Sequence, residues 1–503
     1  MRPLIHEISS SQTPESLVEQ LGGKSGVVLL RSALFDSTQA RYSFVAARPF
    51  LTFRSFGSRC ELTSSRFSHS QFGNPWHVLD VLMSRYELLE EMDLPFPLGG
   101  CFGYWGYDLK NFVEPKLPRR ASDDLELPDC QVGFYDSLVV FDHRLDKIWI
   151  VSTGLDADGS RCADRAKEQA EFWRARLGLE PAKILAITRD RESPERNETP
   201  AKHLPLPFRG GEGRGEGAIS SNLTGSDFLN RIQRAQTYIR AGDIYQVNLS
   251  HRLSAPFASG GWDLFRRLSA VSPAPFSAYL ECGEFQIASS SPELFLRLSG
   301  SQIQTRPIKG TRPRSADPTR DAQLTYELQT SSKEMGELVM ITDLLRNDLG
   351  RVCEFGSVLV PELVRLERYP QVQHLVSTIE GRLRPDVTHF NAFASCFPGG
   401  SITGAPKFRA MEIIDELEPI TRGPYTGAHG YLGFNRESQL SITIRTAVCK
   451  ERIAHFHVGA GIVADSVPAA EYEETLAKAR GFLEALRLGG LAGHDADYAA
   501  LRE

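Results

Sequence analysis

Apolar residues recur along the chain with periods typical of both strands and helices. Short apolar runs at 26–30 and 137–151 indicate a buried strand and a hairpin, and 161–177 has the spacing of a charged helix. After residue 220 the pattern predicts helices and strands that do not alternate as βαβ units. The predicted helices are 224–241, 332–345, 406–416 and 468–486, and the predicted strands are 244–253, 285–289, 294–298, 440–449 and 453–458. This mixture predicts the α+β fold class.

The pattern of apolar positions breaks once, from about Thr188 to Gly217. This stretch is rich in Pro, Gly, Glu and Arg, which is typical of a flexible linker or a surface insertion. The predicted organisation is therefore an N-terminal segment 1–187, a linker 188–217, a catalytic segment 218–490 and a C-terminal tail 491–503.

Composition and charge narrow the class of protein. The chain has 503 residues, is 41% hydrophobic and carries a net charge of -6, which argues against nucleic acid as a partner. Its eight cysteines include no CxxC pair, so they indicate reduced thiols rather than a zinc site or a redox motif. The N-terminus has no apolar h-region and no run approaches the ~20 apolar residues of a membrane span. We expect a cytoplasmic protein with no membrane contact.

Acidic residues recur at helical spacing near the starts of two predicted helices. The groups are Glu334 with Glu337, and Glu471 with Glu474 and Lys478, and the members of each share one helix face. Ser331 and Glu334 also fit a capping box. If the two faces meet, the acids suit Mg²⁺, which takes carboxylates together with waters and substrate oxygens. Taken alone, each pair is more typical of a solvated helix face.

Glycine-rich stretches provide features suited to anions. Residues 397–407 form a Gly-rich loop that runs into a predicted helix, where backbone N–H groups and the positive helix end favour an anion. Gly459 and Gly461 would let the backbone approach a ligand closely. Arg445 lies between apolar neighbours in the predicted strand 440–449, so it needs an anionic partner. That partner is either an internal carboxylate or a substrate.

One motif favours a different chemistry. Gly99 to Gly103 fits G-x-C-x-G, the nucleophile-elbow pattern with cysteine in place of serine, so Cys101 is a candidate amidohydrolase nucleophile. The aromatic and Gly-rich residues 104–108 that follow do not favour the helix that an elbow requires. A structural role for Cys101 is therefore the preferred interpretation.

Five segments together resemble the chorismate-utilising family, which includes the large subunits of anthranilate synthase and aminodeoxychorismate synthase and, more distantly, isochorismate and salicylate synthases. The matching segments are Pro307 to Thr311, Asp343 to Asp348, His374 to Ser377, Phe397 to Lys407 and Gly461 to Ser466. The resemblance covers nearly all of residues 222–488 and, more weakly, 99–108. It implies a large composite two-layer β-sandwich core with helices packed outside.

Two positions distinguish members of this family. Lys309 resembles the lysine of aminodeoxychorismate synthases, whereas anthranilate synthases carry alanine there. Isochorismate and salicylate synthases carry a water-activating lysine where this chain has Gln246. The resemblance therefore favours component I of an aminodeoxychorismate synthase, which serves 4-aminobenzoate and folate biosynthesis. Component I of anthranilate synthase is the alternative.

The resemblance also implies a complete site. Glu293 would be the general acid at the C4 hydroxyl of chorismate, Lys309 the nucleophile at C2, and His374 a neighbour of that hydroxyl. The residues expected to hold the substrate are Arg445, Tyr425, Ser401, Thr403, Gly461 and Lys478. Mg²⁺ is the expected cofactor, held by Glu337 and Glu474 directly and by Glu334 and Glu471 through waters or in a second layer.

Two further expectations concern other ligands. Ammonia would come from a separate glutamine amidotransferase subunit, component II, because this chain shows no such domain. Some relatives hold tryptophan beside the N-terminal sheet, and the positions that correspond to parts of that site are Ser32, Arg41, Tyr42, Pro275, Phe276 and Ser277. Gln39 and Ala40 depart from that site.

Overall fold

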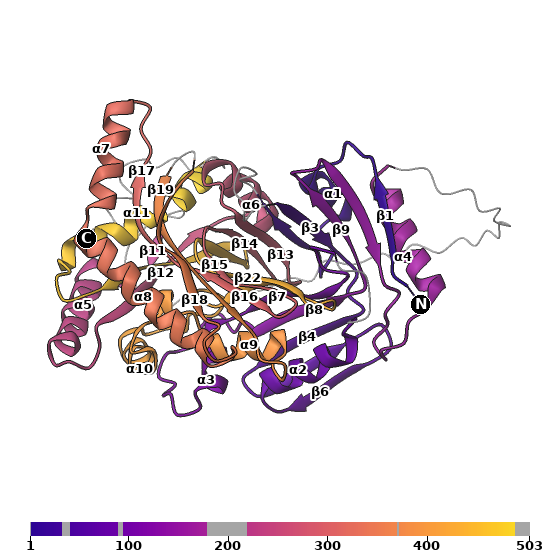
Figure 1. Ribbon diagram of the computed structural model, residues 1–503, viewed down its shortest axis with the longest axis horizontal. Helices are drawn as coiled ribbons and strands as arrows, with labels where there is room; N and C mark the ends of the chain where they lie inside the picture. Colours follow the sequence, from indigo (N-terminus) through magenta and orange to yellow (C-terminus); the bar gives the residue numbers. More distant parts are fainter. Residues whose placement is uncertain (1, 33–40, 89–93, 179–218, 370–371, 488–503) are drawn as a thin grey trace, which may run out of the picture.

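The computed structural model describes residues 2–32, 41–88, 94–178, 219–369 and 372–487, so the predicted linker 188–217 and tail 491–503 lie outside the described residues. The described chain forms two large antiparallel sheets packed face to face, with helices outside (Figure 1). The predicted α+β fold with a two-layer β-sandwich core is confirmed. None of the described helices is long and apolar enough to cross a membrane.

The first sheet has 12 strands among the described residues. Its order is β1 (Leu4–Ile8), β10 (Lys147–Ser152), β9 (Ser137–Asp142), β3 (Tyr42–Ala46), β2 (Val28–Arg31), β13 (Phe276–Glu281), β14 (Phe285–Ser291), β23 (Thr446–Lys450), β24 (Ile453–Ile462), β12 (Gln246–Pro256) and β11 (Ser220–Ser221), with β20 (Gly404–Ala405) also beside β12.

The second sheet also has 12 strands in the described part of the chain. Its order is β17 (Ile308–Pro313), β19 (Val372–Arg382), β16 (Gln302–Arg306), β15 (Leu294–Ser299), β22 (Glu437–Ile442), β21 (Ala428–Gly433), β7 (Gly100–Trp105), β8 (Cys130–Tyr135), β4 (Leu51–Phe56), β5 (Arg59–Thr63) and β6 (Ser68–Phe72), with β18 (Leu359–Arg368) beside β19.

Helices cover the outer faces of both sheets (Figure 1). Those on the first sheet are α1 (Pro14–Leu21), α4 (Ala163–Arg176), α5 (Gly225–Arg240), α6 (Gly260–Val271), α10 (Lys407–Leu417) and α11 (Pro468–Arg487). Those on the second are α2 (Pro75–Tyr86), α7 (Pro318–Gln329), α8 (Ser332–Gly350) and α9 (His389–Cys396). Shorter helical turns are η1 (Tyr107–Leu109), α3 (Lys110–Val113) and η2 (Gly400–Ile402).

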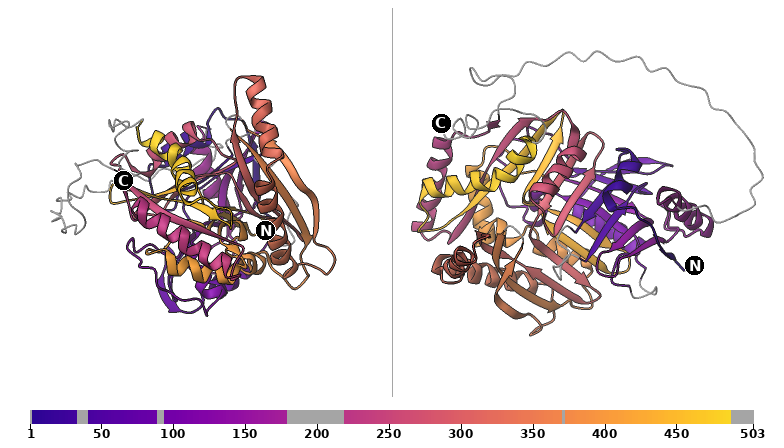
Figure 2. Two further views of the ribbon diagram at one scale, coloured as in Figure 1. Left: turned by 90° about the vertical axis from the view of Figure 1, so that its left-hand side faces the viewer. Right: turned by 90° about the horizontal axis from the view of Figure 1, so that it is seen from above.

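Strands from the two halves of the chain lie side by side in both sheets. In the first sheet β2 pairs with β13, and in the second β7 pairs with β21. Figure 2 shows the purple N-terminal strands continuing into strands from the C-terminal half. The two halves therefore share one core rather than packing as separate layers.

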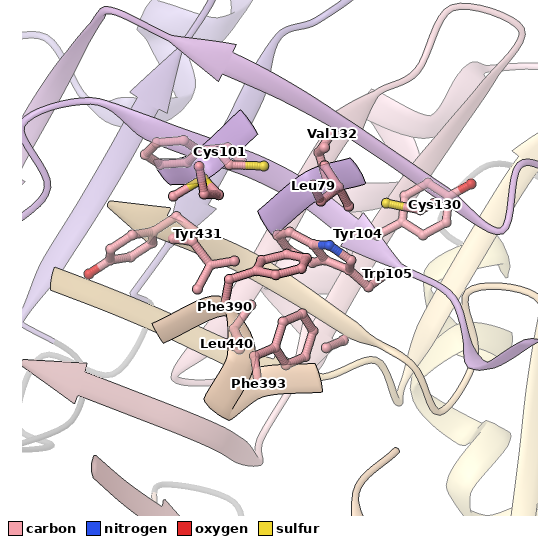
Figure 3. Close-up of a cluster of buried hydrophobic side chains, with 14 of the residues drawn as sticks. Leu79, Cys101, Tyr104, Trp105, Cys130, Val132, Phe390, Phe393, Tyr431 and Leu440 are labelled. Carbon is pink, nitrogen blue, oxygen red and sulfur yellow. The ribbon is translucent and has the colours of Figure 1, made fainter. Parts of the chain in front are cut away.

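The core around β7 settles the role of Cys101. This residue lies inside the strand, is fully buried and belongs to the apolar cluster drawn in Figure 3. In the same cluster the Trp105 ring meets the Phe393 ring edge-on, with centroids 5.2 Å apart. Burial raises the pKa of the Cys101 thiol well above its usual value, so it is a poor nucleophile. The nucleophile-elbow interpretation is wrong, because Cys101 lies inside a strand that continues to Trp105, and the next helical turn begins only at Tyr107.

One predicted strand is also wrong. Residues 440–449 form the end of β22 and the start of β23, which belong to different sheets. Residues 443–445 carry the chain from one sheet to the other, and Arg445 has a φ of 49°. The apolar run continues across the change of sheet because Leu440 and Ile442 of β22 pack in one apolar cluster, and Ala447 and Cys449 of β23 pack in another. Periodicity alone does not reveal that the chain changes sheets within the run.

Candidate active site

Four segments bring the predicted catalytic residues together. Glu293 follows β14, Lys309 lies on β17, Ser401 belongs to η2, and Arg445 lies between β22 and β23. The Lys309 Nζ lies 3.5 Å from the backbone oxygen of Ser401 and donates to it. The Ser401 side chain also hydrogen-bonds to Glu293. One turn of the Gly-rich loop therefore contacts both the proposed acid and the proposed nucleophile.

Glu293 has the environment of a protonated carboxyl. Its side chain is 6% exposed. Burial raises the pKa of Glu293, and the Ser401 hydrogen bond, the Lys309 charge and the Ile308 amide offset this only in part. A carboxyl that retains its proton can act as a general acid.

A bulge in β17 directs Lys309. The pairing of β17 with β19 shifts between Lys309 and Thr311, so Gly310 is an extra residue, with a φ of 67°. A Cβ atom at Gly310 would lie only 2.7 Å from a methyl carbon of Leu328 and 3.1 Å from a carboxylate oxygen of Glu334. Glycine is needed here because any side chain would strain the backbone and collide with two neighbours.

His374 lies opposite this bulge on β19. Its Nδ1 is 2.9 Å from the Thr311 hydroxyl oxygen, and the residue is 1% exposed. Burial, together with the Arg445 charge, lowers the pKa of His374 to about 4. The imidazole is therefore neutral at pH 7, and it can donate one hydrogen bond and accept another as an uncharged group.

Arg445 and Tyr425 are the candidate ligands for a substrate carboxylate. The Arg445 guanidinium makes no ion pair among the described residues, although it senses the charge of Glu293. The Tyr425 ring stacks on His457, with centroids 5.0 Å apart and planes 12° apart. Its hydroxyl lies against Gly459, where a Cβ atom would come within 2.9 Å. A guanidinium without an internal anion can bind a substrate carboxylate.

The floor of the site is the pair of strands β12 and β24. Lys478 donates to the Gly459 backbone oxygen at 2.8 Å and so joins α11 to this floor. Gly461 faces Gln246, whose amide nitrogen would lie 2.5 Å from a Cβ atom there. The buried Gln246 Oε1 and Asn248 Oδ1 accept no hydrogen bond from a described residue. Sequence reasoning missed Asn248 as a lining residue, because its only signal is a place two residues after Gln246 on the same strand face.

Thr403 differs from the other predicted substrate ligands. It is fully buried, and its hydroxyl donates to the Gly399 backbone oxygen at 3.0 Å. The Thr403 backbone oxygen accepts a hydrogen bond from the backbone N–H of Asn248 at 2.8 Å. These contacts fix the Gly-rich loop against β12 and commit the hydroxyl to that loop.

The acidic residues of α8 and α11 face one another. Ser331 caps α8 by accepting from the Glu334 amide at 3.4 Å, but the Glu334 carboxylate pairs with Arg312 at 3.2 Å. Burial raises the pKa of Glu337, and the charges of Glu334 and Glu474 raise it further. Mutual repulsion of this kind shows that carboxylates from both helices share one space.

Two lysine side chains form ion pairs with the carboxylates of α11. Lys478 pairs with Glu474 at 2.8 Å, and Lys333 pairs with Glu471 at 3.2 Å. Among the described residues, no group of three or more His, Cys, Asp or Glu side chains is arranged closely enough to hold a metal by itself. The carboxylates on these two helices, from the buried Glu471 to the half-exposed Glu474, nevertheless match the donor set of Mg²⁺, which takes its remaining ligands from water and substrate.

Five of the six residues proposed for tryptophan line one cavity. This small, partly open cavity lies between the two sheets, and its lining includes Ser32, Tyr42, Pro275, Phe276 and Ser277. Arg41 is the exception, because its guanidinium pairs with Asp142 at 2.6 Å. Gln39 and Ala40 lie outside the described residues.

Comparison with known proteins identifies the family. The chain matches the family described as chorismate binding enzyme over residues 31–484. It is 38% identical over 494 residues to anthranilate synthase component 1 of Acetivibrio thermocellus, which covers 97% of this chain and 96% of that protein. The chain belongs to the chorismate binding enzyme family, and the resemblance predicted from its motifs is confirmed at that level.

Relatives of a second name are equally similar. The chain is 37% identical over 461 residues to aminodeoxychorismate synthase component 1 of Escherichia coli (strain K12), which covers 91% of this chain and 93% of that protein. The crystal structure of anthranilate synthase component I from Streptococcus pneumoniae TIGR4 superposes with a TM-score of 0.72 at 28% identity, covering 89% of this chain and 93% of that one. Overall similarity therefore defines a chorismate-utilising enzyme, and the reaction must be inferred from individual residues.

Proposed function

We propose that this protein is component I of an aminodeoxychorismate synthase, which converts chorismate and ammonia to 4-amino-4-deoxychorismate and retains the pyruvyl group. The observation that carries this proposal is the position of Lys309. Its Nζ contacts the Ser401 backbone oxygen and lies close enough to Glu293, Glu337 and Glu474 to act on them electrostatically. A lysine there can form a covalent intermediate, whereas an alanine cannot.

The proposed reaction has two displacements. In the first, the neutral Lys309 amine bonds to C2 of chorismate, both ring double bonds shift by one position, and the C4 hydroxyl leaves as water with the proton of Glu293. In the second, ammonia bonds to C4, both double bonds shift back, and the C2–N bond breaks to release the neutral Lys309 amine. The ammonium formed at C4 then returns a proton to Glu293. Burial supports the first step by raising the pKa of Glu293, which favours the protonated carboxyl. The neutral His374 would accept or donate a hydrogen bond at the C4 hydroxyl.

The substrate is a dianion, and the site offers cationic or polar groups for both carboxylates. Arg445 and Tyr425 would bind the enolpyruvyl carboxylate, with the Gly461 backbone N–H beside them. Ser401 and Lys478 would line the same pocket. Thr403 would support this pocket through its loop, since its hydroxyl is committed to Gly399.

Glu337 and Glu474 would hold Mg²⁺, with Glu334 and Glu471 acting through waters. The bound ion would neutralise and position the ring carboxylate of chorismate. The chain's own contribution is to present carboxylates from α8 and α11 to one half-exposed space. The ammonia would come from a glutamine amidotransferase partner, as in the two-component organisation expected from the resemblance.

Anthranilate synthase component I is the second candidate, because relatives of that name are as similar as those of the first. A product assay separates them. The protein is incubated with chorismate, Mg²⁺ and ammonium, and products are followed by chromatography and by anthranilate fluorescence. We expect 4-amino-4-deoxychorismate without release of pyruvate. Anthranilate as the main product would reject the proposal.

Replacing Lys309 tests the covalent role. In Lys309→Ala we expect formation of 4-amino-4-deoxychorismate to fall by about 10²-fold or more, because the nucleophile is lost. The side chain is only partly buried, so the unfolding midpoint should stay close to that of the unmodified protein. Arg346→Ala, on the exposed face of α8, is the control and should retain full activity. Full activity in Lys309→Ala would remove the covalent step.

A further inference from the structure

Lys333 is a charged residue in the site that the proposed reaction does not use. It lies in the first turn of α8, and its Nζ is 3.2 Å from an oxygen of Glu471 on α11. The lysine side chain is 47% exposed, whereas that of Glu471 is 4% exposed. This ion pair is a direct link between the two helices that carry the acidic residues.

Lys333 acts on more than one carboxylate. Burial lowers the pKa of Lys333, but Glu471, Glu337 and Glu474 together outweigh that effect and raise it. In return, the Lys333 charge lowers the pKa of both Glu337 and Glu474. One ammonium group therefore serves as counter-ion to three of the four carboxylates proposed for Mg²⁺.

Glu471 is held by more contacts than Lys333 is. Glu471 is held from a second side, because the Ser466 hydroxyl donates to the same carboxylate oxygen at 2.7 Å. Lys333 makes no other hydrogen bond among the described residues, and its flexible stem begins at an exposed backbone position. A competing cation would therefore displace the lysine and leave the carboxylate in place.

We propose that Lys333 is an internal cation that exchanges with Mg²⁺. In the metal-free protein it lies among the acids of α8 and α11 and holds the two helices together. When Mg²⁺ enters, the ammonium moves toward solvent and the carboxylates turn to the metal. The proposal rests on the Mg²⁺ site of the proposed function and adds the residue that sets its affinity.

Two consequences follow from this exchange. Mg²⁺ must replace an existing ion pair, so its affinity in the free protein is lower than four carboxylates would otherwise give. The acidic helices also remain neutralised without metal, so the empty pocket does not force them apart. Removal of Lys333 should therefore tighten Mg²⁺ binding and destabilise the metal-free state.

The experiment titrates Mg²⁺ alone into metal-free protein by calorimetry. We expect the Kd of Lys333→Met to be roughly tenfold lower than that of the unmodified protein, since a positive charge a few Å from the metal is removed. Lys333→Arg keeps the charge and should stay within about threefold of the unmodified value. The control is Arg346→Met, which removes an exposed ion pair 2.9 Å long from the same helix and should leave the Kd unchanged.

Two readouts that do not depend on turnover complete the test. The unfolding midpoint of Lys333→Met in EDTA should lie below that of the unmodified protein, and saturating Mg²⁺ should raise it by a larger increment. Acetylation of Lys333, followed by mass spectrometry, should increase when Mg²⁺ is added. Lys147, whose ion pair with Glu7 lies on the first sheet, should show no such change.

Equal or weaker Mg²⁺ binding by Lys333→Met, or acetylation that Mg²⁺ leaves unchanged, would overturn the exchange. A rise in the chorismate KM of Lys333→Met with an unchanged Mg²⁺ Kd would instead assign Lys333 to the substrate. These outcomes are separate from the product assay. Anthranilate formation would reject the proposed reaction while leaving the Mg²⁺ titration able to support the exchange.

Discussion

At the scale of single residues, the site is defined by what surrounds each ionisable group. Glu293 is buried beside Ser401 and Lys309, and burial raises its pKa despite both neighbours. His374 is buried as well, and its pKa falls to about 4. In the same pocket, burial thus favours the uncharged forms of both the Glu293 carboxyl and the His374 imidazole. Arg445 supplies a positive charge that no described carboxylate pairs with.

Glu293→Gln tests the acid role. The carboxamide keeps the shape of the side chain but supplies no acidic proton, so we expect kcat with chorismate and ammonium to fall by about 10²- to 10⁴-fold. Activity of the unmodified protein should also fall as pH rises and the carboxyl ionises. An Ala control at exposed Glu284 should leave the rate unchanged. Unchanged kcat in Glu293→Gln would assign the proton to another group.

Glu293→Gln should also change how the free energy of unfolding depends on pH. The pKa of Glu293 is higher in the folded protein than its ordinary 4.5, so its contribution is fully present below pH 4.5 and is lost as pH rises through the raised value. The carboxamide of Glu293→Gln does not titrate, so this variant does not lose stability in this way as pH rises. Its free energy of unfolding should therefore gain on that of the unmodified protein as pH increases, as measured by urea unfolding across pH 4 to 8.

Sequence reasoning could name most catalytic candidates, because the segments around Lys309, His374 and Ser401 carry distinctive motifs. It placed Thr403 among the ligands, but whether a hydroxyl faces a substrate or closes its own loop depends on backbone geometry. It also overlooked Lys333. The i, i+4 spacing of Lys333 and Glu337 was visible, but only the fold brings the partner Glu471 on α11 within reach of Lys333.

At the scale of elements, helices were more predictable than strands. The helix predicted for 468–486 is α11 (Pro468–Arg487), and the helix predicted for 224–241 is α5 (Gly225–Arg240), with Thr224 as its N-cap. Helix α8 continues past the predicted end at residue 345, because Leu345, Asp348 and Leu349 are buried and Asp348 pairs with Lys407 at 2.5 Å. Tertiary contacts of this kind extend a helix beyond its local signals.

His389 gives a prediction for one element junction. It lies at the start of α9, with Nδ1 2.9 Å from the Ser438 hydroxyl oxygen and Nε2 2.7 Å from the Gly300 backbone oxygen. Replacing it with leucine leaves both partners buried and should lower the free energy of unfolding at pH 7 by about 1–3 kcal/mol. Urea unfolding of both proteins measures this difference.

The difference should shrink in acid. Burial lowers the pKa of His389 from 6.5 to about 4, so its contribution is present above pH 6.5 and is lost as pH falls through 4. The leucine variant has no such titration. A difference between the two proteins that stays constant from pH 7 to pH 4 would show that His389 does not titrate in this way.

At the scale of the whole molecule, each sheet joins a block of strands from the first half of the chain to a block of strands from the second half. The change in composition at 188–217 predicted a boundary between two segments of the chain, but it carried no information on which strands pair. The pairings of β2 with β13 and of β7 with β21 join residues more than two hundred positions apart. Such contacts depend on the complete fold rather than on local propensity.

Separating the halves tests their dependence on one another. A chain of residues 218–503 alone would expose the paired edges of β13 and β21 and half of the shared core. We expect it to lack cooperative unfolding and chorismate-dependent activity, and co-expression with residues 1–187 to restore both. Gel filtration, thermal unfolding and the product assay measure this. Cooperative unfolding of the isolated second half would show that it is an independent folding unit.

The left-handed backbone at Arg445 has a consequence for engineering. A non-glycine residue with a φ of 49° costs on the order of 1 kcal/mol, which a glycine would not incur. Procedures that rank substitutions by stability alone would therefore favour Arg445→Gly. Arg445→Gly would relieve this strain, but it would also remove the guanidinium that we propose to bind the enolpyruvyl carboxylate. Thermostabilised versions of this enzyme should leave that bend untouched.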